Sequence, residues 1–326
     1  MPGVPTNRPR LMRALFGAVL AVLVTVLLAA CGSSSSSTSK TTAAASPTSA
    51  TTAAGSSSSG TLTLGTKDFT EEFILGQLYK QALAAKGCKI NYKENIGATE
   101  IIDRALTSGQ VDAYPEYTGE SVATVAKINK SASSPQQEYA LAKAFYAKRG
   151  QVMSQITPFF DVDAIAVKKS YATKYGLVTV ADLKKVPHFT LGARPEFLNR
   201  QEGAAGMKSV YGLNNFTFKS LALGIQYQAL DSGSVDAADV FTTDPQLASG
   251  KYTVLTDPKN IFGFQNIALV INKNKLSACP NVLTVVNNVN KLLTTPAVIS
   301  MNKAVAIDKQ PPATVATAFL KANHVI

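Results

Sequence analysis

Two eight-residue stretches, Ala105-Leu-Thr-Ser-Gly-Gln-Val-Asp112 and Ala229-Leu-Asp-Ser-Gly-Ser-Val-Asp236, share six identical positions. Each stretch indicates the end of a helix, a glycine that can adopt the left-handed conformation, and a short buried strand starting at Val-Asp. The copies are 124 residues apart, and the same offset places Tyr117 opposite Phe241 and Glu120 opposite Asp244. The repeat therefore predicts two similar α/β lobes that each present an aromatic residue and an acid to a cleft between them.

The repeat lies inside a longer α/β pattern in each half of the chain. In the first half, strands are expected at 62–65, 89–92 and 111–114, with helices between Asp68 and Gly87, begun by a capping box of Asp68 and Glu71, and at 98–108. In the second half, strands are expected at 163–167 and 189–192 around a short helix at 180–185. One more strand at 266–271 precedes helices at 281–293, 296–306 and 313–322.

The order of these elements predicts how the lobes are built. Alternating strands and helices are typical of parallel α/β sheets. Because the pattern restarts near Asp163 and the last strand lies near Ile267, we expect lobe 1 to comprise 61–162 and 268–326 and lobe 2 to comprise 163–267. Two crossing strands between the lobes can act as a hinge. The expected fold is α/β and two-lobed, with a ligand cleft between the lobes.

Residues 1–30 have the features of an export signal. Three arginines precede an uncharged apolar run at 14–30, which is shorter than the roughly 20 residues of a membrane span. The run ends in small residues before Cys31 and resembles the bacterial lipoprotein signal, in which this cysteine is diacylated. We expect lipid attachment at Cys31, the alternative being a signal cleaved without lipidation. Residues 31–60, almost all Ser, Thr, Ala and Gly, are expected to form a disordered tether.

The composition of the folded body, residues 61–326, restricts the classes of function that this protein can have. It carries 28 basic and 21 acidic residues, a net charge of +7, without a run of like charge. Nucleic-acid binding needs a clustered basic face, so that class is disfavoured. No metal-ligand spacing or cofactor motif is present. Cys88 and Cys279 form an even pair in an oxidising compartment, so a disulfide between them is one hypothesis and two buried free thiols are the other.

Ligands of parallel sheets bind beyond the carboxyl ends of the strands. At these places the sequence has aromatic residues, acids and bases, but no histidine and no nucleophile–base pair, which disfavours an enzyme. Leu64-Gly65-Thr66-Lys67 is matched by Leu191-Gly192-Ala193-Arg194, so a base follows a strand in each half. Of the two nearby arginines, Arg200 is the favoured ligand contact, and Arg194 is interpreted as a surface residue.

Several motifs resemble those of the glycine betaine/choline substrate-binding proteins of osmoprotectant ABC importers. They are Gly65-Thr-Lys-Asp-Phe-Thr-Glu71, Asn95-Ile-Gly-Ala-Thr99, Asp112-Ala-Tyr-Pro-Glu-Tyr-Thr-Gly119, Pro195-Glu-Phe-Leu-Asn-Arg200, Tyr211-Gly212 and Thr242-Thr243-Asp244. Together they cover essentially all of 61–326. The resemblance implies a type II periplasmic-binding-protein fold of the Venus-flytrap kind, and a non-enzymatic receptor that delivers a small solute to a membrane permease.

The resemblance also implies a set of ligand contacts. In that family, tyrosines form a cage around a quaternary ammonium group, while a lysine, an arginine and a threonine hold the ligand's carboxylate. Lys67 and Arg200 match the two bases, and Tyr117 matches one ring. The other three cage positions hold different residues in this chain: Asp163, Phe241 and Gln265. At most two of the four rings remain.

The last threonine of the family's Tyr-Thr-Gly-Thr is Glu120 in this chain. A carboxylate there repels a ligand carboxylate unless Lys67 or Arg200 neutralises it, and Asp163 can act as the counter-ion of a cation. We therefore predict a quaternary-amine osmolyte as ligand, with choline preferred over glycine betaine. Alternatives are another small polar solute such as an amino acid, or an exported α/β enzyme. The protein is expected to be a monomer outside the cell membrane, held there by its lipid, with an ABC permease as partner.

Overall fold

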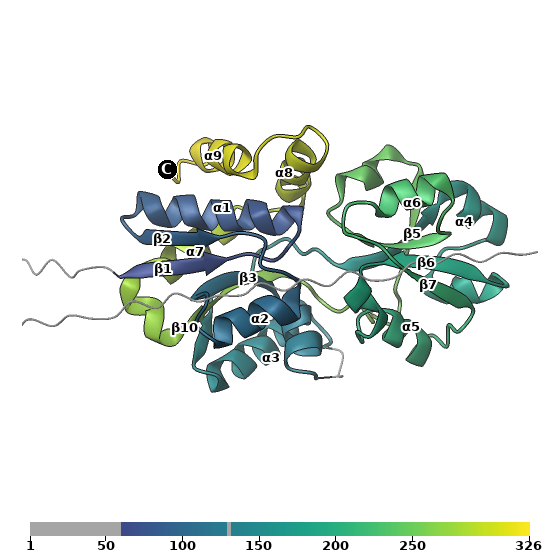
Figure 1. Ribbon diagram of the computed structural model, residues 1–326, viewed down its shortest axis with the longest axis horizontal. Helices are drawn as coiled ribbons and strands as arrows, with labels where there is room; N and C mark the ends of the chain where they lie inside the picture. Colours follow the sequence, from purple (N-terminus) through teal and green to yellow (C-terminus); the bar gives the residue numbers. More distant parts are fainter. Residues whose placement is uncertain (1–59, 129–131) are drawn as a thin grey trace, which may run out of the picture. The chain divides into compact units, whose positions relative to one another are not determined.

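The computed structural model describes residues 60–128 and 132–326. The predicted signal peptide, Cys31 and the tether up to residue 59 lie outside these ranges. Within them, no helix is both long enough and apolar enough to cross a membrane. The described chain forms two five-stranded sheets, and helices flank each sheet (Figure 1).

The first sheet has the strand order β2-β1-β3-β10-β4. Its strands are β1 (Thr61–Gly65), β2 (Lys89–Lys93), β3 (Ala113–Tyr117), β4 (Gln151–Met153) and β10 (Ile267–Asn272). β1 runs parallel to β2 and β3, whereas β10 runs antiparallel to β3 and β4. This sheet therefore combines segments from both sides of the second sheet in the sequence. We call it, with its helices, lobe 1.

The second sheet has the order β7-β6-β8-β5-β9, and with its helices it forms lobe 2. Its strands are β5 (Asp163–Lys168), β6 (Phe189–Ala193), β7 (Phe216–Ser220), β8 (Ala237–Phe241) and β9 (Tyr252–Leu255). β6 runs parallel to β7 and β8, and β5 runs antiparallel to β8 and β9. The two orders correspond strand by strand, so the repeat correctly predicts two related α/β units.

Both copies of the repeat contain the expected helix end and left-handed glycine. Gly109 follows α2 (Thr99–Thr107) with a φ of +75°, and Gly233 follows α6 (Gln226–Ser232) with a φ of +74°. A residue with a Cβ is strained at this φ, which explains the glycine in both copies. Each following strand begins one residue after the aspartate of the repeat. The aromatic residue is consequently the last residue of its strand.

The aspartates of the repeat have the same structural role in both lobes. The carboxylate of Asp112 accepts a hydrogen bond from the N–H of Thr63, and that of Asp236 accepts one from Thr190, each at 2.8 Å. In return, the N–H of each aspartate donates to the carbonyl group of the same threonine. These paired bonds align the central strand of each sheet with its parallel neighbour, and so determine where each strand ends.

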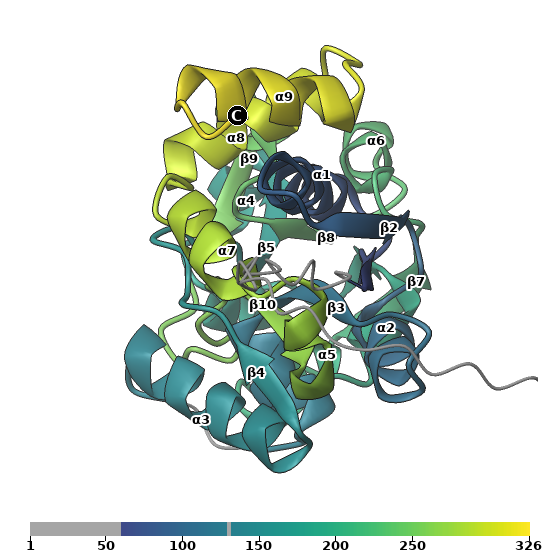
Figure 2. The same ribbon diagram turned by 90° about the vertical axis from the view of Figure 1, so that its left-hand side faces the viewer.

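Helices cover both faces of each sheet (Figures 1 and 2). In lobe 1, α1, α7, α8 and α9 pack on one face, and α2 and α3 on the other. In lobe 2, α4 and α5 pack on one face and α6 on the other. The remaining bounds are α1 (Thr70–Ala85), α3 (Pro135–Lys148), α4 (Lys169–Tyr175), α5 (Ala204–Ser209), α7 (Val282–Asn290), α8 (Thr295–Ala306), α9 (Pro312–Ala322), the π-helix η1 (Glu120–Val125) and the 3₁₀ helices η2 (Val180–Lys185), η3 (Pro195–Leu198), η4 (Pro245–Ser249) and η5 (Lys273–Ala278).

Two segments connect the lobes, at 154–162 and 256–266. They run side by side, because Phe160 and Asn266 form an antiparallel bridge and the N–H of Asp161 donates to the carbonyl group of Gln265 at 3.1 Å. Paired linkers of this kind can absorb the backbone rotation of a hinge.

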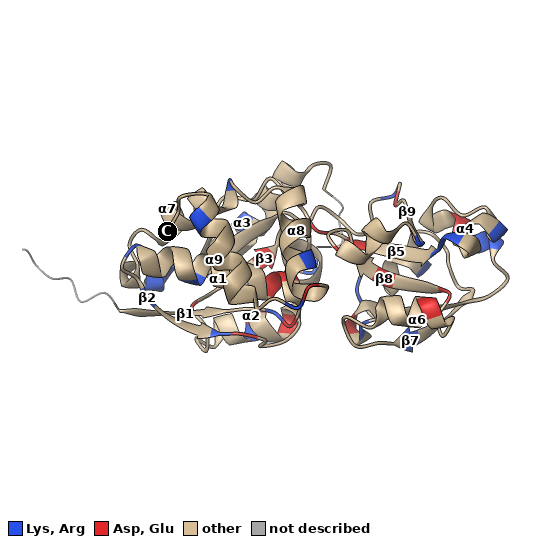
Figure 3. Ribbon diagram, turned by 90° about the horizontal axis from the view of Figure 1, so that it is seen from above, with Lys and Arg blue, Asp and Glu red and all other residues tan. Residues whose placement is uncertain are grey.

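Lys and Arg lie on elements of both lobes (Figure 3).

Two expectations about lobe 1 are resolved by the structure. The predicted capping box of α1 is wrong, because the helix follows Phe69 and has no side-chain cap. The carboxylate of Glu71 is instead buried beside the cleft. Cys88 and Cys279 are joined by a disulfide, with their Cα atoms 5.4 Å apart. The disulfide links residues 191 positions apart in the sequence and ties the start of β2 to the segment before α7.

Candidate ligand-binding site

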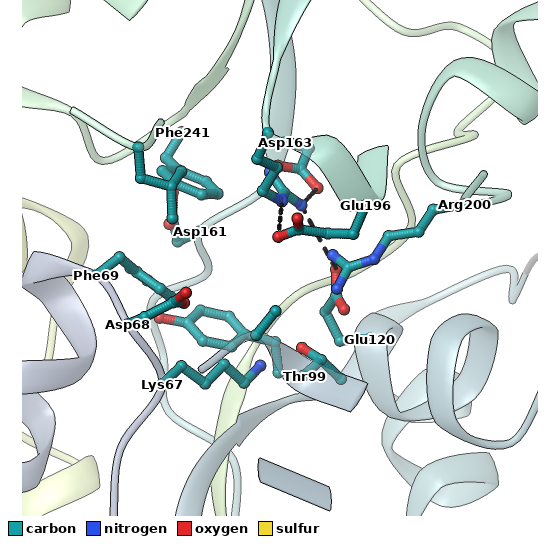
Figure 4. A pocket seen from close by; sticks show the side chains of 14 residues that line it. Lys67, Asp68, Phe69, Thr99, Glu120, Asp161, Asp163, Glu196, Arg200 and Phe241 are labelled. Carbon is teal, nitrogen blue, oxygen red and sulfur yellow. Dashed lines mark hydrogen bonds and ion pairs between the residues drawn. The ribbon is translucent and has the colours of Figure 1, made fainter. Parts of the chain in front are cut away.

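A cavity of about 430 Å³, including the part open to solvent, lies where β3 and β8 end. Both lobes contribute side chains to it (Figure 4). Six of the seven predicted ligand contacts line it: Lys67, Tyr117, Glu120, Asp163, Arg200 and Phe241. The structure therefore brings together side chains that are as far as 174 positions apart in the sequence, Lys67 and Phe241 being the extremes. We call this cavity the ligand site.

Three aromatic rings form one wall of the ligand site. Phe69 lies between the two rings that the repeat pairs: its centroid is 5.9 Å from that of Tyr117 and 5.3 Å from that of Phe241. The planes of Phe69 and Phe241 are only 21° apart, so these rings stack. Phe69 is not among the predicted ligand contacts, although it lies within the motif that carries Lys67. The aromatic wall thus has three rings, one more than the two that the sequence predicts.

Lys67 follows β1 and is already paired within lobe 1. Its Nζ forms an ion pair with the buried carboxylate of Glu116 and lies 4.7 Å from the ring centroid of Tyr117. Burial lowers the pKa of Lys67, but the negative charges of Glu116, Glu72 and Glu120 outweigh burial and raise it above its usual value. Lys67 is therefore a charged residue whose charge is balanced by the protein.

Arg194 occupies the place in lobe 2 that Lys67 has in lobe 1, because β6 corresponds to β1. The interpretation of Arg194 as a surface residue is wrong: it is 7% exposed and lines the ligand site. Asp163 holds its guanidinium through two hydrogen bonds of 2.6 and 2.7 Å, and Asp239 adds a third of 2.7 Å. Asp163 is consequently paired with a cation of its own lobe. The guanidinium carbon also lies 5.3 Å from the ring centroid of Phe241.

Glu120 and Arg200 meet across the two lobes. Oε1 of Glu120 lies 3.0 Å from Nη1 of Arg200 and 3.8 Å from Nη2 of Arg194, and Arg200 also pairs with Glu100 at 2.9 Å. Burial raises the pKa of Glu120, but the charges of Arg200, Lys67 and Arg194 outweigh burial and lower it. Among the described residues, Oε2 of Glu120 has no hydrogen-bond partner. Glu120 is thus a charged wall of the site with one oxygen unpaired.

The seventh predicted contact, Gln265, does not line the ligand site. Its Oε1 accepts a hydrogen bond from the N–H of Glu120 at 3.0 Å, and its Nε2 donates to the carbonyl group of Phe262 at 3.3 Å. A Cβ at position 119 would lie 2.6 Å from Nε2 of Gln265, so Gly119 leaves room for this contact. Gln265 therefore positions Glu120.

The predicted opposition of Glu120 and Asp244 across one cleft is wrong. Asp244 accepts hydrogen bonds from the N–H of Phe241 at 3.0 Å and from the hydroxyl group of Tyr227 at 2.8 Å, both within lobe 2. It lines a neighbouring cavity instead. The offset of the repeat correctly relates strand ends, but the loops that follow β3 and β8 differ: a π-helix begins at Glu120, whereas a 3₁₀ helix follows Asp244.

Further contacts join the lobes beside the ligand site. Thr243 of lobe 2 donates a hydrogen bond of 2.6 Å to Glu71 of lobe 1, and Thr124 of lobe 1 donates one of 2.7 Å to Glu202 of lobe 2. Together with the Glu120–Arg200 pair, these contacts join the two lobes. The site is therefore assembled by the approach of two lobes. Within the described ranges, no group of three or more His, Cys, Asp or Glu is placed to hold a metal ion.

The two-lobed α/β fold, with paired linkers and a cavity between the lobes, defines a type II periplasmic solute-binding protein. Comparison with known proteins specifies the class. The family model of the substrate-binding domain of the ABC-type glycine betaine transport system matches residues 60–322, so the chain belongs to this family. It is a family of solute-binding proteins rather than of enzymes.

Relatives and solved structures agree with this assignment. The glycine-betaine-binding protein of Pseudomonas aeruginosa is 31% identical over 279 residues, which are 82% of this chain and 89% of that protein. The ergothioneine transport permease/ergothioneine-binding protein of Helicobacter pylori is 27% identical over 265 residues, 80% of this chain and 47% of that protein. A solved structure described as a glycine betaine/carnitine/choline ABC transporter is 25% identical with a TM-score of 0.66, covering 81% of this chain and 99% of its own.

Proposed function

We propose that this protein is the lipid-anchored, extracytoplasmic receptor of an ABC importer, and that it captures a quaternary amine, with choline preferred over glycine betaine. Choline is a trimethylammonium cation with a hydroxyl group, whereas glycine betaine carries a carboxylate. The observation that carries the choice is the charge of the ligand site, where each base is already paired and an acid has an unpaired oxygen. The relatives from Pseudomonas aeruginosa and Helicobacter pylori, by their names, bind trimethylammonium compounds.

The aromatic wall suits the ammonium group. A quaternary ammonium has no N–H to donate, so ring faces are its natural partners, at about 0.5–2 kcal/mol for each good contact. Phe69 and Tyr117 of lobe 1 and Phe241 of lobe 2 line the cavity and supply such rings from both lobes. A ligand that contacts rings of both lobes binds the closed state more tightly than the open state. It stabilises the closed state by this difference in affinity. We propose that Lys67 and Tyr117 meet the ligand first and that Phe241 and Arg200 close over it.

The charges around the aromatic wall favour a cation without a carboxylate. The lining contains three bases, and each pairs with carboxylates of the protein. It contains five acids: Asp68, Glu120, Asp161, Asp163 and Glu196. Burial and the charges of Glu71 and Asp244 raise the pKa of Asp161 well above its usual range, and the acids of the lining outnumber its bases. A ligand carboxylate would have to displace a protein carboxylate from an arginine, at a cost that choline avoids.

Glu120 adds a second argument for choline. Its Oε2 has no partner among the described residues and Glu120 lines the cavity, so this carboxylate can accept a hydrogen bond from the hydroxyl group of choline, whereas glycine betaine has no donor. The same atom repels the carboxylate of glycine betaine. An amino acid would present both a carboxylate and an N–H-bearing ammonium group, which the aromatic wall does not favour. We therefore retain the amino-acid ligand as an outcome of the test.

The membrane attachment is proposed from the sequence, since Cys31 lies outside the described residues. Metabolic labelling with an alkyne fatty acid is expected to label the chain, and the Cys31→Ala variant is expected to lose the label and leave the membrane fraction. A labelled Cys31→Ala variant would contradict this attachment site. The matched control is Cys88→Ala, whose residue is buried in the folded body and should leave the label unchanged.

The ligand is tested by a thermal-shift panel of choline, glycine betaine, carnitine, ergothioneine, ectoine and amino acids, with calorimetry on each compound that raises Tm. We expect choline to raise Tm most and to bind at least about 10-fold more tightly than glycine betaine, since 1.4 kcal/mol corresponds to a factor of ten. Tighter binding of glycine betaine would overturn the preference, and binding of amino acids alone would overturn the ligand class.

A further inference from the structure

A second cavity adjoins the ligand site, and we call it the acidic compartment. It measures about 820 Å³, including the part open to solvent, and it shares Asp68, Phe69, Asp161, Leu223 and Phe241 with the ligand site. Four of its lining residues are acids, namely Asp68, Glu71, Asp161 and Asp244. Neither Lys nor Arg is among the described residues that line it. The lining of the acidic compartment therefore differs from that of the ligand site, which includes three bases.

The acids of this compartment lack a cationic partner. No ion pair between described residues includes Asp68, Glu71, Asp161 or Asp244. The donors that reach the last three are neutral: hydroxyl groups, backbone N–H groups and one side-chain amide. Buried carboxylates without a cation are costly in their charged form. Burial accordingly raises the pKa of Glu71 and raises that of Asp244 to about 6.

Unpartnered acceptors in the same wall give an independent indication of a ligand. Oδ1 of Asn302 and Oε1 of Gln246 are buried and have no hydrogen-bond partner among the described residues. Asn302 is 5% exposed, and its Nδ2 is already engaged with Glu71 and Thr243. Both unpaired atoms are oxygens, so the lining of the compartment has hydrogen-bond acceptors without donors. A group that enters the compartment should therefore donate hydrogen bonds.

An organic ammonium group fits these features better than a metal ion. In the residues that the structure describes, no three His, Cys, Asp or Glu are close enough together to coordinate a metal. A protonated amine supplies a positive charge and three N–H donors on one atom, which matches separated carboxylates and amide oxygens. Asp68 and Asp161 line both cavities, so a chain that runs from one cavity to the other stays beside carboxylates.

We propose that the acidic compartment is a second subsite, which binds the protonated amine of an elongated quaternary-amine ligand while its trimethylammonium group lies on the aromatic wall. The proposal rests on the proposed function, because the aromatic wall must hold the first cation. It extends the ligand class from choline to dications with a few carbon atoms between the two nitrogens. Choline fills the ligand site alone.

The test compares matched pairs of ligands by calorimetry on the purified full chain at pH 7.5. Each pair consists of an ω-aminoalkyl-trimethylammonium with three to six carbons and the alkyl-trimethylammonium of the same length. We expect at least one amino compound to bind about 10-fold or more tightly than its alkyl partner, as a charge-assisted hydrogen bond allows. Choline is the reference for the ligand site.

Two variants locate the effect. Asp244→Asn keeps the acceptor for the hydroxyl group of Tyr227 but removes the charge, and it lines the acidic compartment alone. Asp231→Asn is the matched control, because Asp231 is exposed and also accepts a hydrogen bond from a tyrosine hydroxyl, that of Tyr252 at 2.8 Å. We expect Asp244→Asn to reduce the amino-over-alkyl advantage at least about 3-fold without changing choline affinity, and Asp231→Asn to change neither.

The outcomes separate this subsite from the proposed function. Equal affinities within all pairs, while choline binds, would overturn the second subsite and leave the function intact. An advantage that Asp244→Asn leaves unchanged would show that the amine lies elsewhere, and it too would overturn the subsite. If choline and all alkyl compounds fail to bind, the proposed function fails and this inference fails with it. Unchanged thermal unfolding of both variants establishes that they fold.

Discussion

Glu120→Thr is expected to shift the ligand preference of this protein toward glycine betaine. The carboxylate of Glu120 lies 3.0 Å from Arg200 and 3.8 Å from Arg194, and its backbone N–H is held by Gln265. A ligand carboxylate that bound the same arginines would lie about 4–5 Å from Glu120, and at an effective dielectric constant of about 20 this repulsion is about 3–4 kcal/mol. The two guanidinium groups offset part of it, so we expect a net penalty of about 1.5–3 kcal/mol.

This penalty corresponds to an increase of about 10- to 100-fold in glycine betaine affinity when Glu120 is replaced. Choline should lose affinity by about 5-fold, because its cation no longer meets the negative charge of Glu120. The ratio of the two dissociation constants is therefore expected to change by at least about 50-fold. Isothermal titration calorimetry with both ligands, at one pH and one ionic strength, measures the ratio directly.

Two further variants make this measurement decisive. Glu120→Gln removes the charge at nearly constant size, so it should reproduce most of the shift. Glu100→Gln is the matched control, since Glu100 also pairs with Arg200, at 2.9 Å, but does not line the ligand site. A ratio that stays within about 3-fold in both Glu120 variants, or a shift of equal size in Glu100→Gln, would refute the electrostatic reasoning.

Three other changes have expected outcomes. Phe69→Ala should weaken choline binding about 3- to 30-fold in calorimetry because a ring of the aromatic wall is lost, and an unchanged affinity would remove Phe69 from the site. Burial, together with the charge of Glu120, raises the pKa of Glu202 to about 8. Between about pH 4.5 and 8 the folded state thus keeps a proton that the unfolded state releases, so the free energy of unfolding falls as pH rises through this window. Glu202→Gln should flatten this dependence on pH, measured by urea titrations at several pH values. A slope equal to that of the unmodified chain would contradict this assignment. Replacing Cys88 and Cys279 by alanine should lower the free energy of unfolding by about 2–5 kcal/mol, and thiol titration of the unreduced, unfolded protein should find neither sulfur free.

Much of the fold was predictable because it depends on local patterns. The repeat correctly indicates two related units, since a helix end, a left-handed glycine and a buried strand are each encoded by neighbouring residues. β7 and β9 are absent from the predicted strands; both are edge strands whose side chains are mostly exposed or half-buried, although Phe216-Thr-Phe-Lys-Ser220 of β7 alternates in polarity and could have been recognised. β4 has only three residues and gives little signal of any kind.

Most members of the site were predictable, whereas Phe69, the buried position of Arg194 and the pairings of the charges were not. Lys67, Tyr117 and Phe241 follow strands in a known order, so their approach is implied by the topology. Arg194 could have been found from the match between Leu64-Gly65-Thr66-Lys67 and Leu191-Gly192-Ala193-Arg194, which places a base after equivalent strands. The motif resemblance favours Arg200 instead. In the structure, both arginines reach the same cavity.

The chain's local patterns account for the two lobes, the two crossings between them and the strand ends at which a ligand can bind. Folding settles which charges neutralise one another: Arg194 pairs with Asp163 and Asp239, and Glu120 pairs with Arg200, 80 positions away. Folding also places Phe69 between Tyr117 and Phe241. Electrostatic and cation–π energies depend on separations of a few ångströms. Such separations between distant segments are set by the packing of whole lobes, which no short stretch of sequence encodes.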